Sequence, residues 1–208
     1  PKPLVLATTQ TICSGTSFTA TPTNGSGNSV PSTTTYAWTT PISAPSGAIT
    51  GGLAQATGLN TISQTLTNTT TTPATIEYTV TPTSGACTGT PFTINITVNP
   101  TPTTLGLNNQ TYCNGINTSE IVFNNAVAGT TYSWTNSNTA IGLPASGTGN
   151  IPVFTPTNNG TAPITATISV IATANGCSRV AETFTITVNP SPAVNFSPTN
   201  QTICSGET

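Results

Sequence analysis

One short block built around a cysteine occurs three times in the 208 residues. It reads QTIC at 10–13, QTYC at 110–113 and QTIC at 201–204. Other blocks recur in the same order: TTYAW at 34–38 and TTYSW at 130–134, SGAC at 84–87 and NGC at 175–177, FTINITVNPTP at 92–102 and FTITVNPSP at 184–192. Such ordered repetition indicates that one folding unit was duplicated. We therefore expect two full repeats, 1–100 and 101–190, and the first strand and turn of a third, 191–208.

Within each repeat, apolar residues alternate with polar ones, and Thr fills many of the polar positions. The segment 92–100, for example, places Phe92, Ile94 and Ile96 on one face. This period of two is typical of half-buried strands, and no segment shows a helical period. The expected strands of the first repeat cover 4–8, 17–22, 34–39, 60–68, 74–82 and 92–100. Because each repeat has the length of one β-sandwich, we expect an all-β chain of tandem Ig-like sandwiches.

Proline-rich segments join the repeats, with VNPTPTT after the first and VNPSPAV after the second. Proline removes a ladder donor and fixes φ, so it ends the last strand of each repeat. The Pro-x-Pro spacing favours a short and fairly stiff connector. Sandwiches on stiff connectors predict a rod. The chain opens at PKPLVLATTQ and closes at TICSGET, and we expect it to be part of a longer protein.

Charged residues make up only 3% of the chain, with four acidic and two basic side chains and no His. General acid–base catalysis needs several titratable groups close together, so we expect no enzyme activity and no catalytic residues. Metal sites need clustered carboxylates, Cys or His, so we expect no metal ion and no cofactor. Two basic residues cannot neutralise a run of phosphates, which argues against nucleic-acid binding. No apolar run approaches the roughly 20 residues that a membrane-spanning helix needs, so we expect no membrane insertion.

The five cysteines are disulfide candidates: Cys13, Cys87, Cys113, Cys177 and Cys204. No Lys, Arg or His, the neighbours that favour a reactive thiolate, lies near Cys13 in sequence, so structural cross-linking in an oxidising, extracellular compartment is expected. Three pairings are open. The first pairing lies within repeats, as Cys13–Cys87 and Cys113–Cys177. It is favoured because each full repeat contains two cysteines and because a repeat closed by its own bond would be a self-contained folding unit. The second pairing crosses the joint, as Cys87–Cys113 and Cys177–Cys204. The third is Cys13–Cys177, because the first turn and the last hairpin of a sandwich lie at opposite ends.

Trp38 and Trp134 have two readings, as sugar-stacking platforms or as core residues. Each stands beside an alternating Tyr on the third expected strand, which favours the core of an Ig-like sandwich. Glu77 and Glu182 lie at non-equivalent places in the two repeats, so we expect solvated surface charges. The Thr-rich segments at 67–75 and 155–163 read as loops before a strand, with glycan binding or attachment as the alternative.

Several blocks together resemble PKD-like (Ig-like) repeats: ICSG, YAWT, SGAITGGLAQATGLNTI, YTVTPTSGAC and FTINITVNPTP. Such repeats occur in long surface proteins of Bacteroidota, including large gliding-motility adhesins and other cargo of type IX secretion. The resemblance implies an extracellular, bacterial cell-surface location and an adhesive or spacer role. One departure limits it. The polycystic-kidney-disease domain proper has an acidic, glycine-rich turn after its Trp, whereas TTPIS follows Trp38 and TNSNT follows Trp134.

We therefore expect non-catalytic structural stalk repeats of a long bacterial surface adhesin or filament, which hold a distal binding tip away from the cell. The alternative is an Ig-like module that binds a glycan or a protein. Such a module could also be an accessory domain of a secreted enzyme. The expected partners are neighbouring repeats of the same chain, with surface glycans or lateral self-association as further candidates. Self-association is a candidate because these low-charge sandwiches lack the Lys residues that usually prevent edge strands from pairing with another chain.

Overall fold

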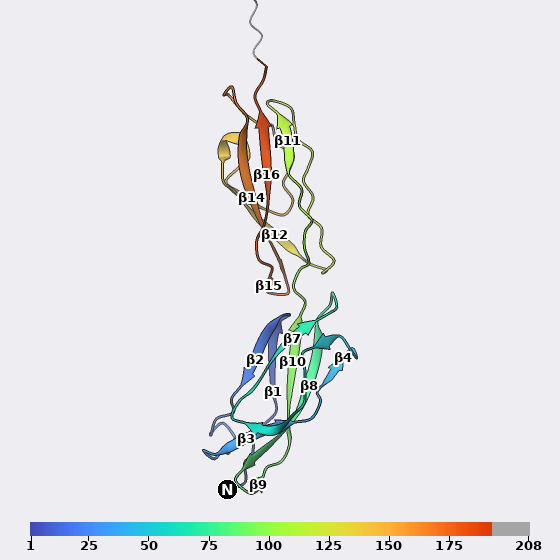
Figure 1. Cartoon of the computed structure of the whole chain (residues 1–208), viewed down its shortest axis with the longest axis vertical. Helices are drawn as coiled ribbons and strands as arrows, with labels where there is room; N and C mark the ends of the chain where they lie inside the picture. Colours follow the sequence, from blue (N-terminus) through green and yellow to red (C-terminus); the bar gives the residue numbers. More distant parts are fainter. Residues whose placement is uncertain (193–208) are drawn as a thin grey trace, which may run out of the picture. The chain divides into compact units, whose positions relative to one another are not determined.

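The computed structural model describes residues 1–192, so Cys204 and most of the expected third-repeat segment 191–208 lie outside the described residues. The first repeat consists of strands (Figure 1). They are β1 Thr8–Cys13, β2 Thr16–Ala20, β3 Thr34–Trp38, β4 Ile42–Ala44, β5 Ile49–Thr50, β6 Gln55–Leu59, β7 Ile62–Asn68, β8 Ala74–Ser84, β9 Cys87–Thr88 and β10 Phe92–Asn99.

Two sheets form this repeat. The larger has seven strands in the order β1-β10-β8-β3-β6, with β4 and β9 also paired to β8, and the smaller has the order β2-β7-β5. The alternation seen in the sequence decides the burial, since Phe92, Ile94, Ile96 and Val98 of β10 are buried and the residues between them are not. The rest of the core follows the same rule, with Phe18, Tyr36, Trp38, Ile62, Leu66, Ile76, Tyr78 and Val80. The predicted all-β, Ig-like fold is confirmed.

Strand β1 differs from the expectation of a strand at 4–8. It runs over Thr8–Cys13 and pairs in parallel with β10, from Thr8 opposite Ile94 to Cys13 opposite Asn99. The segment before it is pinned elsewhere, because Leu4 exchanges two backbone hydrogen bonds of 2.8 Å with Ser29. Pro3 has no N–H to offer a ladder. The strand therefore begins later and ends at the cysteine.

The second repeat contains the elements β11 Gln110–Cys113, β12 Thr131–Asn136, the 3-10 helix η1 Thr139–Ile141, β13 Ser146–Thr148, β14 Ile164–Ala174, β15 Cys177–Ser178 and β16 Glu182–Asn189. Their sheet has the order β11-β16-β14-β12-β13, with β15 also paired to β14. Strand β11 lies parallel to β16, as β1 does to β10, and Cys113 stands opposite Asn189. The duplicated blocks thus fold in the same way.

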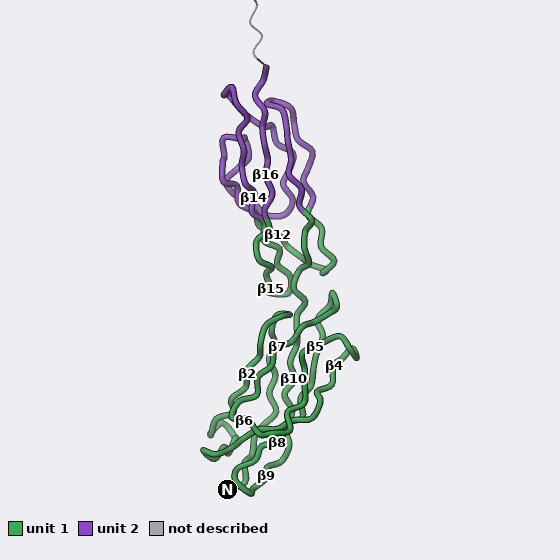
Figure 2. The backbone as a smooth tube through the Cα atoms, viewed as in Figure 1, with its two compact units in different colours: residues 1–106, 123–133, 170–182 green, residues 107–122, 134–169, 183–208 purple. Residues whose placement is uncertain are grey.

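The chain divides into two compact units, shown in two colours in Figure 2. One combines Pro1–Gly106, Phe123–Ser133 and Val170–Glu182, and the other contains Leu107–Val122, Trp134–Ser169 and the residues from Thr183 on. The first unit therefore includes the whole first repeat together with two parts of the second, Phe123–Ser133 and the segment Val170–Glu182 that contains the end of β14 and β15. Among the described residues, no helix is long and apolar enough to cross a membrane.

Candidate functional site

The cysteines give the chain its one covalent cross-link in the described part, and it lies inside the first compact unit. Strand β1 ends at Cys13, and Gly15 with φ of +83° turns the chain into β2. Far along the sequence, the turn at Asn175 and Gly176 leads into β15, which begins with Cys177. These two cysteines are bonded, with a Cα–Cα separation of 5.6 Å and a sequence separation of 164.

The prediction of Cys13–Cys87 and Cys113–Cys177 within repeats is therefore wrong. The reason lies in the register of the first sheet. Cys13 stands opposite Asn99, at the end of β10 that faces Ala74 of β8. Cys87 pairs with Ser84, ten residues further along β8. Ten residues of strand span about 33 Å, far beyond the roughly 7 Å that a disulfide tolerates between Cα atoms.

The other two described cysteines, Cys87 and Cys113, are free and exposed. The pairing across the joint, Cys87–Cys113, is thus also not formed. Its second bond, Cys177–Cys204, is excluded because Cys177 is already bonded to Cys13. Of the three pairings that the sequence leaves open, the topological one is the pairing found.

Backbone and amide hydrogen bonds surround the disulfide. The Nδ2 of Asn99 donates to the carbonyl of Asn175 at 2.8 Å, and the carbonyl of Asn99 accepts from the amide of Ser14 at 2.8 Å. The hydroxyl of Thr101 donates to the carbonyl of Ser14 at 3.3 Å. One asparagine therefore fixes the turn after Cys13 and contacts the hairpin that carries Cys177.

An ion pair holds the connector that follows β10. Arg179 Nε donates to Glu182 Oε1, and both oxygens of this carboxylate accept from the amide of Leu105 at 3.2 Å. Arg179 also donates from Nη2 to Thr104 Oγ1 at 3.0 Å and from Nη1 to the carbonyl of Pro102 at 3.5 Å. The side chains of Arg179 and Glu182 are 34% and 20% exposed. Glu182 is thus not the solvated charge that the sequence predicts, whereas Glu77 is exposed.

Sequence reasoning missed this ion pair, although the sequence carries a signal for it. Arg179 is the only Arg in a chain with six charged side chains, and a Glu follows it three residues later. In so uncharged a chain, such neighbours are more informative than usual.

A buried asparagine recurs at one place in both repeats and was also missed. Asn68, 7% exposed, donates from Nδ2 to the carbonyls of Thr72 and Val98, both at 2.8 Å, and accepts from the amide of Thr70. Asn158, 3% exposed, makes the corresponding bonds. These run to the carbonyls of Ala162 and Val188 and from the amide of Gly160. Each amide ties a Thr-rich loop to the last strand of its repeat, so these loops have a structural role.

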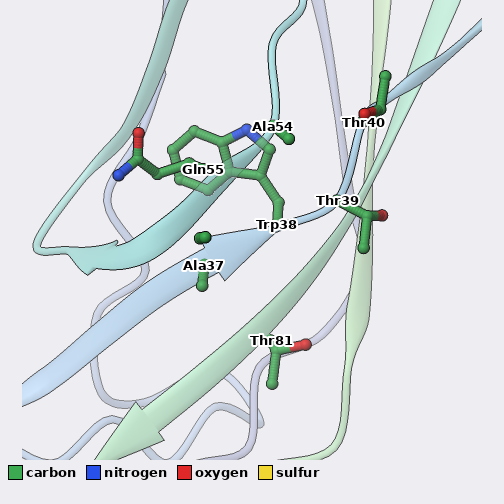
Figure 3. Close-up of a pocket in the computed structure, with 8 residues that line it drawn as sticks. Ala37, Trp38, Thr39, Thr40, Ala54, Gln55 and Thr81 are labelled. Carbon is green, nitrogen blue, oxygen red and sulfur yellow. The ribbon is translucent and has the colours of Figure 1, made fainter.

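The two tryptophans lie in the core, each only 4% exposed. Trp38 Nε1 donates to the carbonyl of Leu53 at 2.9 Å, so the indole is held against the loop before β6. Beside it lies an open hollow of about 450 Å³, lined by residues such as Ala37, Gln55 and Thr81 (Figure 3). Stacking on a sugar needs an accessible ring face, which a buried indole does not offer.

Little titration chemistry accompanies these features. Burial raises the pKa of the Tyr78 hydroxyl, which donates to Gln64 Oε1 at 2.8 Å. Burial also raises the pKa of Tyr36, whose hydroxyl has no hydrogen-bond partner in the part of the chain that the structure describes. Within residues 1–192, no three Cys, Asp or Glu side chains gather in a group that could hold a metal ion. The described cysteines support thiol oxidation and cross-linking.

Comparisons with known proteins found one family match, over the first repeat, and distant structural matches. Residues 10–102 match the family model of the PKD-like domain. The chain is similar to the crystal structure of DIP-gamma IG1 and IG2, at 10% identity and a TM-score of 0.43, covering 91% of this chain and 98% of that one. It is also similar to human mucin-like protocadherin EC1-2, at 12% identity and a TM-score of 0.31, covering 89% and 96%. No curated protein matches the chain.

Proposed function

We propose, with the PKD-like match of residues 10–102 as the premise, that this chain is a non-catalytic structural stalk segment of a long bacterial surface adhesin or filament. PKD-like and Ig-like domains are typical of extracellular modules, and a disulfide fits an oxidising extracellular environment. In the proposal, the repeats 1–100 and 101–190 form part of a rod that holds a distal binding tip away from the cell. A Bacteroidota source, with type IX secretion and a role in gliding motility, is part of the same proposal.

The observation that carries the proposal is the bond between Cys13 and Cys177. It joins the first repeat to the last hairpin of the second, in addition to the main chain. A stalk must resist bending at its connectors, and a second covalent link beside a proline-containing connector supplies that resistance. A module that only binds a ligand has no need of such a link.

The test is a measurement of joint flexibility by single-molecule FRET, with dyes on the exposed thiols of Cys87 and Cys113 and with Cys204→Ser to remove the third free thiol. We expect a narrow distribution of transfer efficiencies for the disulfide-bonded protein. The Cys13→Ser/Cys177→Ser variant should give a broader one. A broad distribution in the bonded protein, equal to that of the variant, would contradict the stalk.

Ligand binding is the second candidate, and the hollow beside Trp38 is the observation that favours it. Its lining combines apolar groups with Thr hydroxyls and the Gln55 amide, which suits the mixed surface of a carbohydrate or a peptide. A glycan array with the two-repeat protein tests this function. Binding that is lost in Gln55→Ala would support it, and an array without signal would leave the stalk as the function.

A further inference from the structure

The two exposed thiols occupy the positions that are bonded in the other repeat. Cys113 ends β11 opposite Asn189, just as Cys13 ends β1 opposite Asn99. Cys87 begins β9 opposite Ser84, just as Cys177 begins β15 opposite Ala174. Among the described residues, each repeat therefore carries one cysteine of the joint that is not bonded. Both of these cysteines are exposed, whereas the bonded Cys177 is buried.

The groups that support the existing bond are repeated as well. The donor Asn99 has its equivalent in Asn189, in the shared TVNP block. The acceptor is the backbone carbonyl of Asn175, whose φ is +51°, and Gly85 holds the equivalent place with φ of +58°. Because the acceptor is a main-chain group, the change of side chain from Asn to Gly leaves this hydrogen bond available.

We propose that Cys113 of one copy of this chain forms a disulfide with Cys87 of a second copy, which reproduces the Cys13–Cys177 joint between molecules. The contact is heterologous, so each dimer keeps one unbonded Cys87 and one unbonded Cys113 and can grow further. This names a partner for the proposed stalk but does not depend on it. The FRET test above concerns the joint within one molecule, and its result leaves this bond untouched.

One part of the joint is missing at the new contact. The ion pair of Arg179 and Glu182 has no equivalent in the first repeat, where Gly89 and Thr90 stand at the corresponding distances from Cys87 and Phe92. A second copy also lacks the main-chain connector, which raises the effective concentration of the two halves of the joint within one molecule. Assembly is therefore expected to need a high protein concentration and a covalent bond to hold it.

The bond forms by two exchange steps with a small disulfide oxidant such as oxidised glutathione. The Cys113 thiolate attacks the oxidant, breaks its S–S bond and releases one glutathione thiolate. The Cys87 thiolate of the second copy then attacks the mixed disulfide and releases the other. The two protons lost by the cysteines go to the two glutathione thiolates, and the oxidant takes up the two electrons.

Two complementary variants test the proposal, both in the full chain with Cys204→Ser. One carries Cys87→Ser and keeps Cys113, and the other carries Cys113→Ser and keeps Cys87. Both are mixed at equal, near-millimolar concentration in a glutathione redox buffer, and the dimers are quantified by mass spectrometry. We expect the mixed dimer to exceed either symmetric dimer by about tenfold, with a Cys113–Cys87 peptide. A statistical ratio of two to one, or the absence of mixed dimer, would overturn the proposal.

Two controls separate docking from thiol reactivity. The rate of reaction with a small aromatic disulfide measures the reactivity of each thiol, and the preference for the mixed dimer should persist after correction for it. The same mixture in 8 M urea, with the oxidant unchanged, should give the statistical ratio because the folded ends are lost. A preference that survives in urea would also overturn the proposal.

Discussion

Removal of the Cys13–Cys177 bond should destabilise both repeats, although each repeat contributes only one of the two sulfurs. When the first repeat unfolds and the second remains folded, the bond closes a loop from Cys13 to the connector near residue 100, roughly 90 residues. When the second unfolds and the first remains folded, the loop from the connector to Cys177 has roughly 80 residues. The chain-entropy relation gives about 4.5 kcal/mol of unfolding free energy for either loop.

The assay compares the urea unfolding of Cys13→Ser/Cys177→Ser with that of the disulfide-bonded protein, and it uses tryptophan emission as the signal. Each repeat contains one buried tryptophan, Trp38 in the first and Trp134 in the second, so the two transitions can be assigned from Trp→Phe variants. Cys87, Cys113 and Cys204 are replaced by Ser in all samples, because free thiols would exchange with the disulfide. With an m value of about 1.5 kcal/mol/M, both midpoints should fall by about 3 M.

The decisive comparison is between the midpoint shifts of the first and the second unfolding transition. A disulfide confined to one repeat would stabilise that repeat alone, so a shift in only one of the midpoints would refute the loop assignment. Changes below about 1 kcal/mol in the unfolding free energy of both repeats would also refute it, because the entropic account assigns a much larger stabilisation to loops of this length.

Three further predictions concern buried or half-buried groups. Asn68→Ala should lower the unfolding free energy of the first repeat by about 3 kcal/mol, because the buried carbonyl of Val98 and the part-buried carbonyl of Thr72 lose their donor. Asn95→Ala, on the outer face of β10, should change it by less than about 0.5 kcal/mol in the same urea titration. Burial raises the pKa of Tyr78 in the folded state, so the unfolded chain loses this proton first. The contribution of Tyr78 to the unfolding free energy is complete below about pH 10 and should fall by about 1.4 kcal/mol per pH unit above that. In urea titrations between pH 9 and 11.5, the unfolding free energy of Tyr78→Phe should therefore decline less steeply with pH than that of the unmodified protein. Glu182→Ala should speed hydrogen exchange of the Leu105 amide about tenfold by NMR, and an unchanged rate would show that the carboxylate does not protect it.

Apart from 4–8, the expected strands of the first repeat overlap strands of the structure, because their information is local. In β10, the alternation of Phe92, Ile94 and Ile96 with polar residues states which face is buried, and the structure agrees. The cysteine pairing is not local. It depends on which end of the sheet each strand reaches, and β1 ends at Cys13 while the segment around Leu4 pairs with Ser29.

The individual side chains likewise fall into those that local sequence predicts and those that it does not. Tyr36 and Trp38 were expected in the core from their spacing alone, and both are buried. The role of Asn68 could not be derived from its position before a Thr-rich loop, since its acceptors include Val98, 30 residues further along. Likewise, the Leu105 amide that donates to Glu182 lies on a connector 77 residues earlier in the chain. Long-range hydrogen bonds leave little trace in one sequence, apart from the recurrence of Asn in both repeats.

The Cys13–Cys177 bond also changes how the folded chain would carry tension. A pull applied at the two ends of the described chain has a covalent route through the first 13 residues, the sulfur bridge and the residues from Cys177 on. The intervening segment, a sequence separation of 164, forms a closed loop that the pull cannot draw out. At about 3.5 Å per residue, the unfolded segment would be about 570 Å long, a length that the chain can gain only when the bond is reduced and the repeats unfold. The redox potential of the surroundings would then decide whether unfolding of the repeats can lengthen the chain at all.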